Sequence, residues 1–342
     1  MSDAAWGGSA TANVREEGGR PSHRLAEGTI RVGVVGLGAF GKHHARHYAA
    51  HPNASLAAVC DVDWTNASAA GEKYGAKAYA GYPELIGKVD AVSITVPAVA
   101  HHAVARAFLD AGVHVLVEKP IANDTTEARD LVEAAARTRT ILQVGHIERF
   151  SPVFCALRDR LIAPRRVSCV RRTKWSGRSS DVDVILDLMI HDIDLVLTMA
   201  GSPVISVAAS GAEVVSGKID EAEAWITFAN GMIATLSASR AATENERKIT
   251  ITEAETSYAA DLSIPSLTSV SRRVPGAVPT DIPLTTRDNL AAEIDAFLKS
   301  VATGMPPKVD GLSGLAALEI AERIRTAVAE NEAAMRGEGR IQ

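Results

Sequence analysis

Cysteine and aromatic residues are scarce in this sequence. Only three of the 342 residues are cysteine, and Cys60, Cys155 and Cys169 form no CxxC pair and no Cys/His group with the spacing of metal ligands. We therefore expect neither a disulfide nor a structural metal. Phe, Trp and Tyr together make up 4% of the chain, so no stacking platform for single-stranded nucleic acid is visible.

Long apolar runs and an excess of one charge are missing as well. No apolar run approaches the ~20 residues that span a bilayer, and the first 29 residues lack the apolar core of a secretion signal. The 36 Lys and Arg against 41 Asp and Glu give a formal charge of -5, which offers no general reason to bind nucleic acid or an anionic membrane. We expect a cytoplasmic protein with neither as its partner.

The hydrophobic content of 46% is enough for about two domains of ordinary size. Residues 1–29 hold thirteen Gly, Ala or Ser and show no sustained period, which predicts a flexible leader. Between residues 30 and 145, short β-branched runs alternate with helical stretches. This rhythm predicts an α/β domain with a parallel, doubly wound sheet that helices cover on both faces.

From residue 146 to 335 the rhythm changes to long stretches that contain Thr, Val and Ile. They predict an α+β domain with a large, mainly antiparallel open sheet and helices near 182–199, 290–303 and 312–330. Asn230-Gly231, inside one of these stretches, is typical of a hairpin turn in which both residues tolerate a positive φ.

A glycine-rich motif follows the first predicted strand and opens a helix. Gly36-Leu-Gly38-Ala39-Phe40-Gly41 has the spacing G-x-G-x-x-G, which allows a tight turn and a close approach of the backbone to a pyrophosphate. Asp61 ends the second predicted strand, where a carboxylate accepts hydrogen bonds from ribose hydroxyls and repels a 2′-phosphate. These residues predict NAD in preference to NADP. Two alternatives stay open: Lys42 or Arg46 reaching a 2′-phosphate, and Asp61 serving only as a helix cap.

The tripeptide Glu118-Lys119-Pro120 directly follows a predicted strand at 113–117. Ligands of doubly wound folds bind at this carboxyl edge of the sheet. Lys119 can there donate a hydrogen bond to a substrate hydroxyl or to a developing oxyanion. The alternative is a surface ion pair between Glu118 and Lys119.

The stretch from residue 183 to 194 joins acidic residues to a histidine. At about 100° per residue, Asp183, Asp187, His191 and Asp194 share one stripe of a largely apolar helix. Burying several carboxylates without partners is costly, so we expect the stripe to line a wet cleft. His191 can then exchange a proton with a substrate hydroxyl, with Asp187 orienting the imidazole or the sugar. A structural histidine, a solvated acidic face and a metal site are the alternatives.

Basic residues gather between positions 158 and 178. Arginine binds phosphate oxygens in a bidentate fork, which fits a substrate that carries phosphates, such as a nucleotide sugar. A solvated strand face or a subunit contact explains most of the run more simply, and nucleic acid explains it poorly because the chain is acidic overall. The run consists of Arg158, Arg160, Arg165, Arg166, Arg171, Arg172, Lys174 and Arg178.

These motifs in this order resemble the Gfo/Idh/MocA family over residues 30–330. The resemblance rests on the glycine motif, Asp61, the turn at 95–101, Glu118-Lys119-Pro120 and Asp187-x-x-x-His191-x-x-Asp194. It implies a Rossmann domain over residues 30–145, and a substrate-binding domain over 146–335 whose open sheet pairs subunits into homodimers or homotetramers. The implied activity is NAD(P)-dependent oxidation or reduction of a sugar or polyol, with Lys119 and His191 as the catalytic pair and Asp187 assisting them. The implied cofactor-binding residues are Gly36, Gly38, Ala39, Phe40, Gly41, Asp61, Thr95, Pro97, His101, Glu118 and Lys119.

Within the family, residues 144–152 and 183–194 look most like UDP-N-acetylglucosamine 3-dehydrogenases. Such enzymes make a 3-keto nucleotide sugar for a partner aminotransferase, often toward lipid A. Arg149, with one or two of Arg171, Arg172, Lys174 and Arg178, is then expected at the diphosphate or uracil end. The implied substrate-binding set is Lys119, Arg149, Lys174, Arg178, Asp187 and His191. Rival expectations are a dehydrogenase of a free sugar, inositol or other polyol, and a non-catalytic sensor of dinucleotide and sugar.

Overall fold

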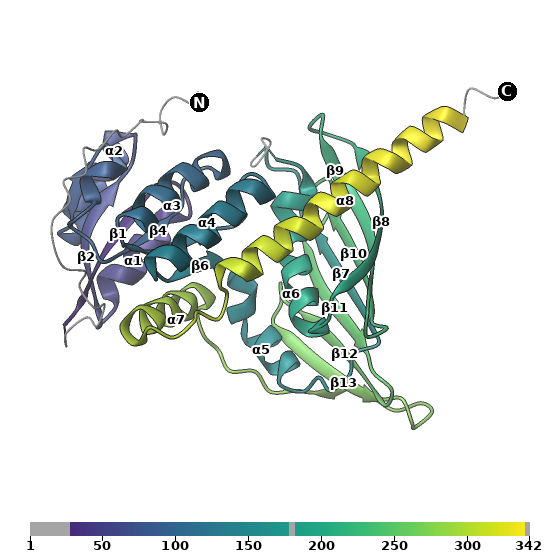
Figure 1. Cartoon of the computed structure of the whole chain (residues 1–342). Helices are drawn as coiled ribbons and strands as arrows, with labels where there is room; N and C mark the ends of the chain where they lie inside the picture. Colours follow the sequence, from purple (N-terminus) through teal and green to yellow (C-terminus); the bar gives the residue numbers. More distant parts are fainter. Residues whose placement is uncertain (1–27, 178–181, 339–342) are drawn as a thin grey trace. The chain divides into compact units, whose positions relative to one another are not determined.

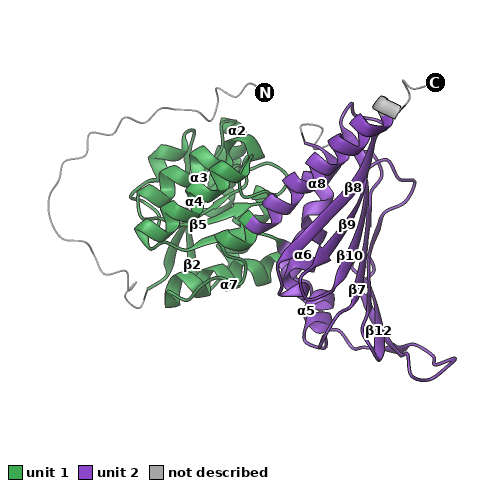
Figure 2. Ribbon diagram, turned by 45° about the vertical axis from the view of Figure 1, so that its right-hand side comes forward, with its two compact units in different colours: residues 1–146, 290–315 green, residues 147–289, 316–342 purple. Residues whose placement is uncertain are grey.

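The computed structural model describes residues 28–177 and 182–338. The chain divides into two compact units (Figure 2). Unit 1 comprises residues 1–146 and 290–315, and unit 2 comprises residues 147–289 and 316–342. The chain passes from unit 1 to unit 2 after His146, one residue beyond the boundary expected from the sequence.

Unit 1 contains a six-stranded sheet of order β3-β2-β1-β4-β5-β6 in which all neighbouring strands are parallel. The central strands β1, β4 and β5 are almost entirely buried, which explains why they are nearly continuous apolar runs in the sequence. The doubly wound parallel sheet predicted from the sequence is confirmed. The strands are β1 (Ile30–Val35), β2 (Ala54–Cys60), β3 (Lys77–Tyr79), β4 (Ala91–Ile94), β5 (His114–Glu118) and β6 (Leu142–Gly145).

Helices lie on both faces of this sheet. Figure 2 shows α3 and α4 on one side of the strands and α7 on the other. The helices of unit 1 are α1 (Gly41–Ala50), α2 (Trp64–Tyr74), α3 (His101–Asp110), α4 (Thr125–Thr138) and α7 (Asn289–Thr303), with 3-10 turns η2 (Tyr82–Leu85) and η3 (Ala98–Ala100).

The placement of α7 differs from the expectation that it belongs to the second domain. It is part of unit 1, where the side-chain amide of Gln143 in β6 donates to the backbone carbonyl of Glu293 at 3.2 Å. This pairing spans 150 residues of sequence. An apolar helical pattern predicts that a helix forms, but it does not say which sheet the helix covers.

Unit 2 contains an eight-stranded sheet of order β14-β13-β12-β11-β7-β10-β9-β8. Neighbouring strands are antiparallel except for β7 and β10, which run parallel. The mainly antiparallel sheet predicted from the sequence is confirmed. The strands are β7 (Arg166–Arg172), β8 (Val204–Glu213), β9 (Ile219–Phe228), β10 (Ile233–Ser239), β11 (Glu246–Thr252), β12 (Thr256–Asp261), β13 (Ser266–Ser271) and β14 (Thr280–Asp281).

One face of this sheet is covered and the other is open. Along β9, every second residue from Asp220 to Phe228 is buried, while Glu221, Glu223 and Trp225 between them are exposed. In Figure 1 the helices α5 and α6 of unit 2 lie together on one face of the strands. The helical elements of unit 2 are η4 (Ile147–Phe150), α5 (Pro152–Arg158), the π-helix η5 (Ile185–Met189), α6 (Ile190–Ala200) and most of α8 (Gly311–Glu338).

The turn between β9 and β10 forms the expected hairpin in a different way. Gly231 has a φ of 84°, but Asn230 has no positive φ. Asn230 acts through its side chain instead: its Oδ1 accepts from the amide of Met232 at 3.0 Å, and its Nδ2 donates to the carbonyl of Ala200 at 3.0 Å. A side chain that satisfies the backbone of the turn removes the need for a second left-handed residue.

Candidate active site

The glycine motif forms the turn between β1 and α1, and its three glycines have different roles. Gly36 has a φ of 89°, and a Cβ there would lie 2.8 Å from the backbone of Thr95. A Cβ on Gly41 would lie 1.9 Å from the carbonyl oxygen of Gly36, whereas the Cβ position of Gly38 has no heavy atom within 4 Å. Gly36 and Gly41 are therefore required by the turn itself. Gly38 leaves an open backbone surface that a pyrophosphate can approach.

Thr95 holds this turn from the end of β4. The hydroxyl of Thr95 donates to the carbonyl oxygen of Gly36 at 2.6 Å. The side chain of Thr95 therefore positions the turn by binding the backbone of Gly36. Ala39, Phe40 and Pro97 are exposed, as residues that contact a cofactor from the surface must be.

Asp61 ties the end of β2 to the same turn. Its Oδ2 accepts from the amide of Leu37 at 2.6 Å, and its Oδ1 accepts from the amide of Asp63 at 2.8 Å. A carboxylate offers about four acceptor sites, so sites remain for ribose hydroxyls. The alternative that Asp61 caps the second helix is wrong, because Asp63 caps α2 by accepting from the amide of Thr65.

The Glu118-Lys119-Pro120 segment leaves the end of β5 and is held by histidines. Oε1 of Glu118 lies 3.1 Å from Nε2 of His44. Lys119 is half-buried, and the peptide bond between Lys119 and Pro120 is cis.

His101 lies beneath this segment, with Nδ1 at 2.7 Å from the carbonyl oxygen of Pro120 and Nε2 at 3.0 Å from that of Val96. Burial lowers the pKa of His101, and the two hydrogen bonds to carbonyls oppose this only in part. Both ring nitrogens face the backbone, so His101 positions the two loops and presents neither nitrogen to a ligand.

In unit 2, Asp187 and His191 lie on either side of a helix junction. Asp187 is in the π-helix η5 and His191 is in the first turn of α6, and both side chains are half-buried. The sequence predicts one regular helix over 182–199, but the structure has a π turn within this range. The i→i+5 hydrogen bonds of the π turn change the spacing of side chains around the helix axis. Single π turns inside helices are frequent at functional sites.

Asp183 stabilises the start of this helix. Its Oδ1 accepts from the amides of Ile185 and Leu186 at 3.1 and 3.0 Å, and its Oδ2 pairs with Nε of Arg325 at 2.8 Å. The expectation that Asp183 lines a wet cleft is wrong, because the side chain is buried against its own helix and paired with α8.

Asp194 is also buried and paired. It is 1% exposed, and its two oxygens accept from Nε and Nη2 of Arg149 at 2.7 and 2.6 Å. The wet-cleft expectation is wrong here too, since a bidentate guanidinium offsets the cost of burying the carboxylate. Arg149, expected at the substrate, thus has a partner within the protein.

Arg171 is the buried member of the basic run. It is 2% exposed, its Nε and Nη2 donate to Asp192 at 3.0 and 2.9 Å, and its Nη1 donates to Glu148 at 3.0 Å. Burial alone would lower the pKa of Arg171, but the two carboxylates raise the pKa by more than burial lowers it, so it lies above its ordinary value. Burial raises the pKa of Asp192 against the opposing effect of Arg171; the bidentate geometry is that of an ion pair. Arg171 is not available to a substrate phosphate.

The remaining basic candidates differ in accessibility. Arg172 and Lys174 are exposed, with Arg172 at a loose 3.8 Å from Glu246. The backbone amide of Lys174 donates to Oδ1 of Asn245 at 3.1 Å. Arg178 lies outside the described residues.

Arg240, which directly follows β10, was not among the residues expected from the sequence. Its Nη1 donates to the carbonyl of Val182 at 2.7 Å, its Nε donates to Asp220 at 2.8 Å, and its guanidinium carbon lies 5.4 Å from the ring centroid of Trp175. Arg240 therefore holds both the end of the segment after β7 and the residue before Asp183. No local pattern marks it, because its partners are scattered along the chain.

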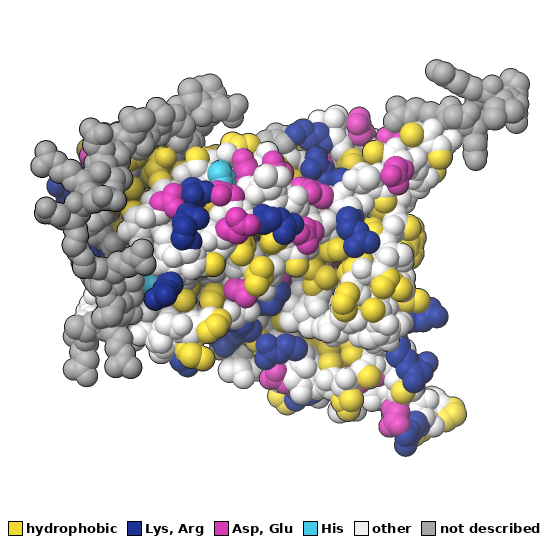
Figure 3. Space-filling view, in the orientation of Figure 1, with side chains coloured by type: hydrophobic (Ala, Val, Ile, Leu, Met, Phe, Trp, Pro, Cys, Tyr) yellow, Lys and Arg dark blue, Asp and Glu magenta, His cyan; other side chains and the backbone are white. Residues whose placement is uncertain are grey.

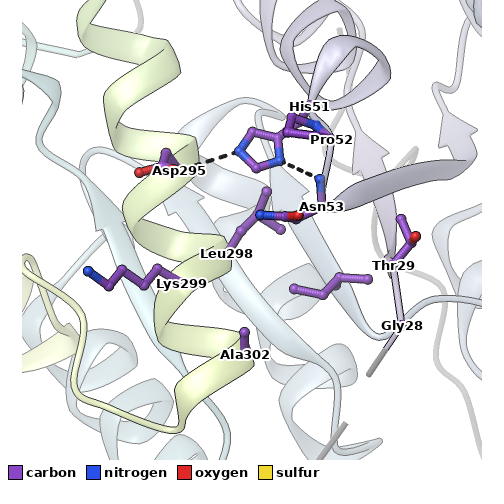
Figure 4. A pocket seen from close by; sticks show the side chains of 10 residues that line it. Gly28, Thr29, His51, Pro52, Asn53, Asp295, Leu298, Lys299 and Ala302 are labelled. Carbon is purple, nitrogen blue, oxygen red and sulfur yellow. Dashed lines mark hydrogen bonds and ion pairs between the residues drawn. The ribbon is translucent and has the colours of Figure 1, made fainter. Parts of the chain in front are cut away.

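A separate cavity of about 640 Å³ lies in unit 1 where α7 faces the end of α1 (Figure 4). Nε2 of His51 lies 3.4 Å from Asp295, and the amide of Asn53 donates to Nδ1 of His51 at 3.2 Å. No candidate site residue from the sequence lines this cavity. We therefore do not assign the chemistry to it.

Charged side chains of both signs mix on the face drawn in Figure 3. On α3 and α4, Arg106 and Arg137 both pair with Asp110, at 2.9 and 2.8 Å. Within residues 28–177 and 182–338, no three His, Cys, Asp or Glu side chains gather as metal ligands, and no helix is long and apolar enough to cross a membrane.

Two relatives resemble this chain along nearly its whole length. UDP-N-acetylglucosamine 3-dehydrogenase from Acidithiobacillus ferrooxidans is 38% identical over 306 residues, which cover 87% of this chain and 97% of that protein. Its crystal form in space group P21 matches with a TM-score of 0.83 over 88% of this chain and 98% of that chain. Inositol 2-dehydrogenase from Rhizobium meliloti is 30% identical over 325 residues, which cover 88% and 98% of the two chains. A levoglucosan dehydrogenase in complex with NADH and levoglucosan, 19% identical with a TM-score of 0.81 over 88% and 98% of the chains, shares the fold alone.

Family models match both units. Residues 30–146 match the oxidoreductase family with an NAD-binding Rossmann fold, and residues 139–258 match the GFO/IDH/MocA C-terminal domain. The predicted NAD-binding domain and the resemblance seen in the sequence are thereby confirmed. The chain belongs to the Gfo/Idh/MocA family of NAD-binding oxidoreductases.

Proposed function

We propose that this oxidoreductase oxidises the C3 hydroxyl of UDP-N-acetylglucosamine to give the 3-keto nucleotide sugar. The observation that carries this proposal is the 38% identity, over 87% of the chain, to a UDP-N-acetylglucosamine 3-dehydrogenase. A partner aminotransferase would consume the ketone, toward lipid A.

The turn at the start of α1 fits NAD. The pyrophosphate would lie against the open backbone of Gly38. The remaining acceptor sites of the Asp61 carboxylate would accept hydrogen bonds from the ribose hydroxyls. The charge of Asp61 disfavours a 2′-phosphate, which favours NAD over NADP. Bound NAD supplies the acceptor for the hydride that leaves the sugar carbon.

Lys119 and His191 manage the proton of the reacting hydroxyl. As the carbinol becomes a ketone, its oxygen carries partial negative charge, which a cationic or N–H donor stabilises. One of the pair takes the proton as a general base and the other donates a hydrogen bond to the oxygen. Asp187 orients the sugar or the imidazole of His191.

We assign the diphosphate to Lys174 and Arg172. Both are exposed, whereas Arg149 already forms a bidentate pair with Asp194. Arg149 then supports the helix that carries His191.

We also infer a homodimer or homotetramer formed through the open face of the unit 2 sheet. Trp225 on β9 and Ile233 on β10 are 44% and 38% exposed, and exposed apolar side chains on a flat sheet face favour association. Light scattering of the purified protein, with Trp225→Glu as the variant expected to dissociate it, tests this inference.

The function is tested by the absorbance of NADH formed from NAD with a panel of UDP-sugars and free polyols. A glutamate-dependent aminotransferase, added in parallel samples, removes an unfavourable keto product. NADH formed with UDP-N-acetylglucosamine alone supports the proposal. NADH formed only with inositol or another polyol would move the assignment to the second candidate, which the 30% identity to an inositol 2-dehydrogenase favours. No NADH with any substrate, alongside tight NAD binding, would indicate a sensor.

A further inference from the structure

A chain of buried polar side chains leads from the core of unit 1 to Glu118, the residue before Lys119. Nε2 of His44 lies 3.1 Å from Oε1 of Glu118, and Nδ1 of His44 lies 3.2 Å from Oγ of Ser93. Oγ of Ser93 lies 2.7 Å from the hydroxyl of Tyr48. His44, Ser93 and Tyr48 are all 0% exposed, and the side chain of Glu118 is 15% exposed.

The carboxylate fixes the direction of the first hydrogen bond in this chain. A carboxylate oxygen of Glu118 can only accept, so Nε2 of His44 donates to it. Nδ1 of His44 shares a hydrogen bond with the hydroxyl of Ser93, and the oxygen of Ser93 shares one with the hydroxyl of Tyr48. Hydrogen bonds connected in a chain strengthen one another.

The carboxylate of Glu118 is also held from the neighbouring strand. Glu118 pairs in register with Gly145 of β6, and a Cβ on Gly145 would lie 2.8 Å from the carboxyl carbon and both oxygens. The carboxylate therefore rests on bare backbone on one side and is bound by His44 on another. A side chain at position 145 would therefore collide with the carboxylate of Glu118.

His44 also contacts the glycine turn. The ring of Phe40 lies with its centroid 5.3 Å from that of His44. On the far side of Lys119, His101 holds the carbonyl of Pro120 at 2.7 Å. Lys119 is thus the residue between two anchored neighbours, one of them tied to the cofactor turn.

We propose that His44 is a positioning residue for the reaction: by binding the carboxylate of Glu118 it holds the end of β5 and sets the position of Lys119. The inference rests on the proposed role of Lys119 as a catalytic residue. A displacement of about 1 Å in a reacting group can cost on the order of 100-fold in rate, so we expect loss of the anchor to lower the rate measurably.

The test compares His44→Leu with His44→Gln. Leucine keeps the volume but removes the donor to Glu118, and we expect kcat to fall by about 10- to 100-fold while KM for the sugar and the Kd for NADH change little. Glutamine places an amide N–H near the position of Nε2, and we expect it to restore most of kcat. Phe108→Leu, a change in the buried core of α3, is the control: it is expected to lower Tm without lowering kcat.

A second readout needs no substrate. Acetic anhydride labels lysine amines, and mass spectrometry gives the rate at Lys119 relative to the exposed Lys299 of the same unit. We expect His44→Leu to change the relative rate at Lys119 several-fold and His44→Gln to restore it.

The outcomes separate this inference from the proposed function. The inference is overturned if His44→Leu keeps the wild-type kcat and the wild-type labelling rate at Lys119. It is also overturned if His44→Gln loses as much kcat as His44→Leu and the loss follows the fall in Tm. Wild-type turnover in Lys119→Met would instead overturn the role of Lys119, whatever the labelling shows. If UDP-N-acetylglucosamine is not oxidised, the substrate proposal fails while the labelling comparison still decides the role of His44.

Discussion

The two units hold their candidate site residues by different means. In unit 1, side chains hold the loops by hydrogen bonds to backbone groups: Thr95 binds the carbonyl of Gly36, Asp61 binds the amide of Leu37, and His101 faces the carbonyl of Pro120. In unit 2, buried arginine–carboxylate pairs surround the helix of His191. The difference matters because loss of a side chain in unit 1 removes a hydrogen bond to the backbone, whereas loss of one partner in unit 2 leaves a buried charge unpaired.

A buried ion pair adds little net stability, but removing one partner is costly. Desolvation offsets most of the attraction between the charges, whereas a lone buried charge is left without compensation. Substitution of the paired residues of unit 2 is therefore expected to lower stability, and substitution of the candidate site residues of unit 1 is expected to lower cofactor binding or turnover. The following changes test this contrast.

Lys119→Met is expected to have the largest effect, mainly on turnover. Loss of a general acid or base lowers kcat by about 10²- to 10⁴-fold, while Tm stays near wild type because Lys119 is half-buried at a loop. Steady-state kinetics and thermal unfolding measure the two quantities. Lys299→Met, which changes an exposed lysine in the same unit, is the control. Full turnover in Lys119→Met would remove this residue from the mechanism.

Arg149→Met is expected to destabilise unit 2 by about 3–5 kcal/mol, because Asp194 is left buried and unpaired. Urea unfolding followed by tryptophan fluorescence gives the change; Trp175 and Trp225 lie in unit 2 and Trp64 lies in unit 1, so the signal follows both units. The double variant Arg149→Met with Asp194→Leu removes both charges and should recover at least half of the loss. If Arg149→Met leaves the urea midpoint unchanged, the Arg149–Asp194 pair does not stabilise unit 2.

Asp220→Asn tests the pH dependence of unit 2. Burial alone would raise the pKa of Asp220, but hydrogen bonds from Ser216, from the amides of residues 214 and 215 and from Arg240 outweigh it, and the pKa lies well below its ordinary value. A lowered pKa in the folded state means that the carboxylate adds stability above its unfolded pKa, near 4, and loses it as the pH falls.

We expect Asp220→Asn to cost about 1.5–3 kcal/mol at pH 7 and less at pH 3, because at pH 3 the unfolded carboxyl is largely protonated while the folded one is still ionised. Urea midpoints at the two pH values measure the gap between the variant and the wild type. A gap of equal size at both would show that the charge of Asp220 does not contribute.

Gly38→Ala should have the smallest effect, limited to the cofactor. The added methyl meets no protein atom within 4 Å, so Tm should be unchanged, but it obstructs the approach of the pyrophosphate. We expect the Kd for NADH to rise about tenfold, or about 1.4 kcal/mol. Gly81→Ala, at a glycine with φ of -126° and ordinary contacts, serves as the control. Unchanged affinity in Gly38→Ala would mean that the dinucleotide does not cross this part of the turn.

Local signals predicted most of unit 1. The strand, glycine turn and acidic residue of a dinucleotide site are separated by short, regular intervals, and Gly36, Gly41 and Asp61 lie where that spacing requires. The one element assigned elsewhere was α7, whose partner Gln143 is 150 residues away. His44 was also overlooked, although a histidine one turn after the last glycine was a visible signal.

In unit 2 the sequence indicated the sheet and the helix but not the partners of the charges. Asp183 and Asp194 look like cleft residues when their partners are unknown, and Arg171 looks like a phosphate ligand. The structure shows all three side chains buried and paired, Asp194 and Arg171 with buried partners and Asp183 with the exposed Arg325. The π turn before His191 was also invisible, because periodicity assumes a constant rotation per residue.

The sequence by itself determined the order of the elements, the parallel and antiparallel sheets and the dinucleotide turn, since each depends on residues a few positions apart. Only the tertiary structure decided which charged side chains are buried, which are accessible and which anchor the segments around Lys119 and His191. Those outcomes depend on pairs such as Arg149 with Asp194 and His44 with Glu118, 45 and 74 residues apart. The environment of a charged residue depends on which distant residue the fold places beside it, and a local sequence pattern does not contain that information.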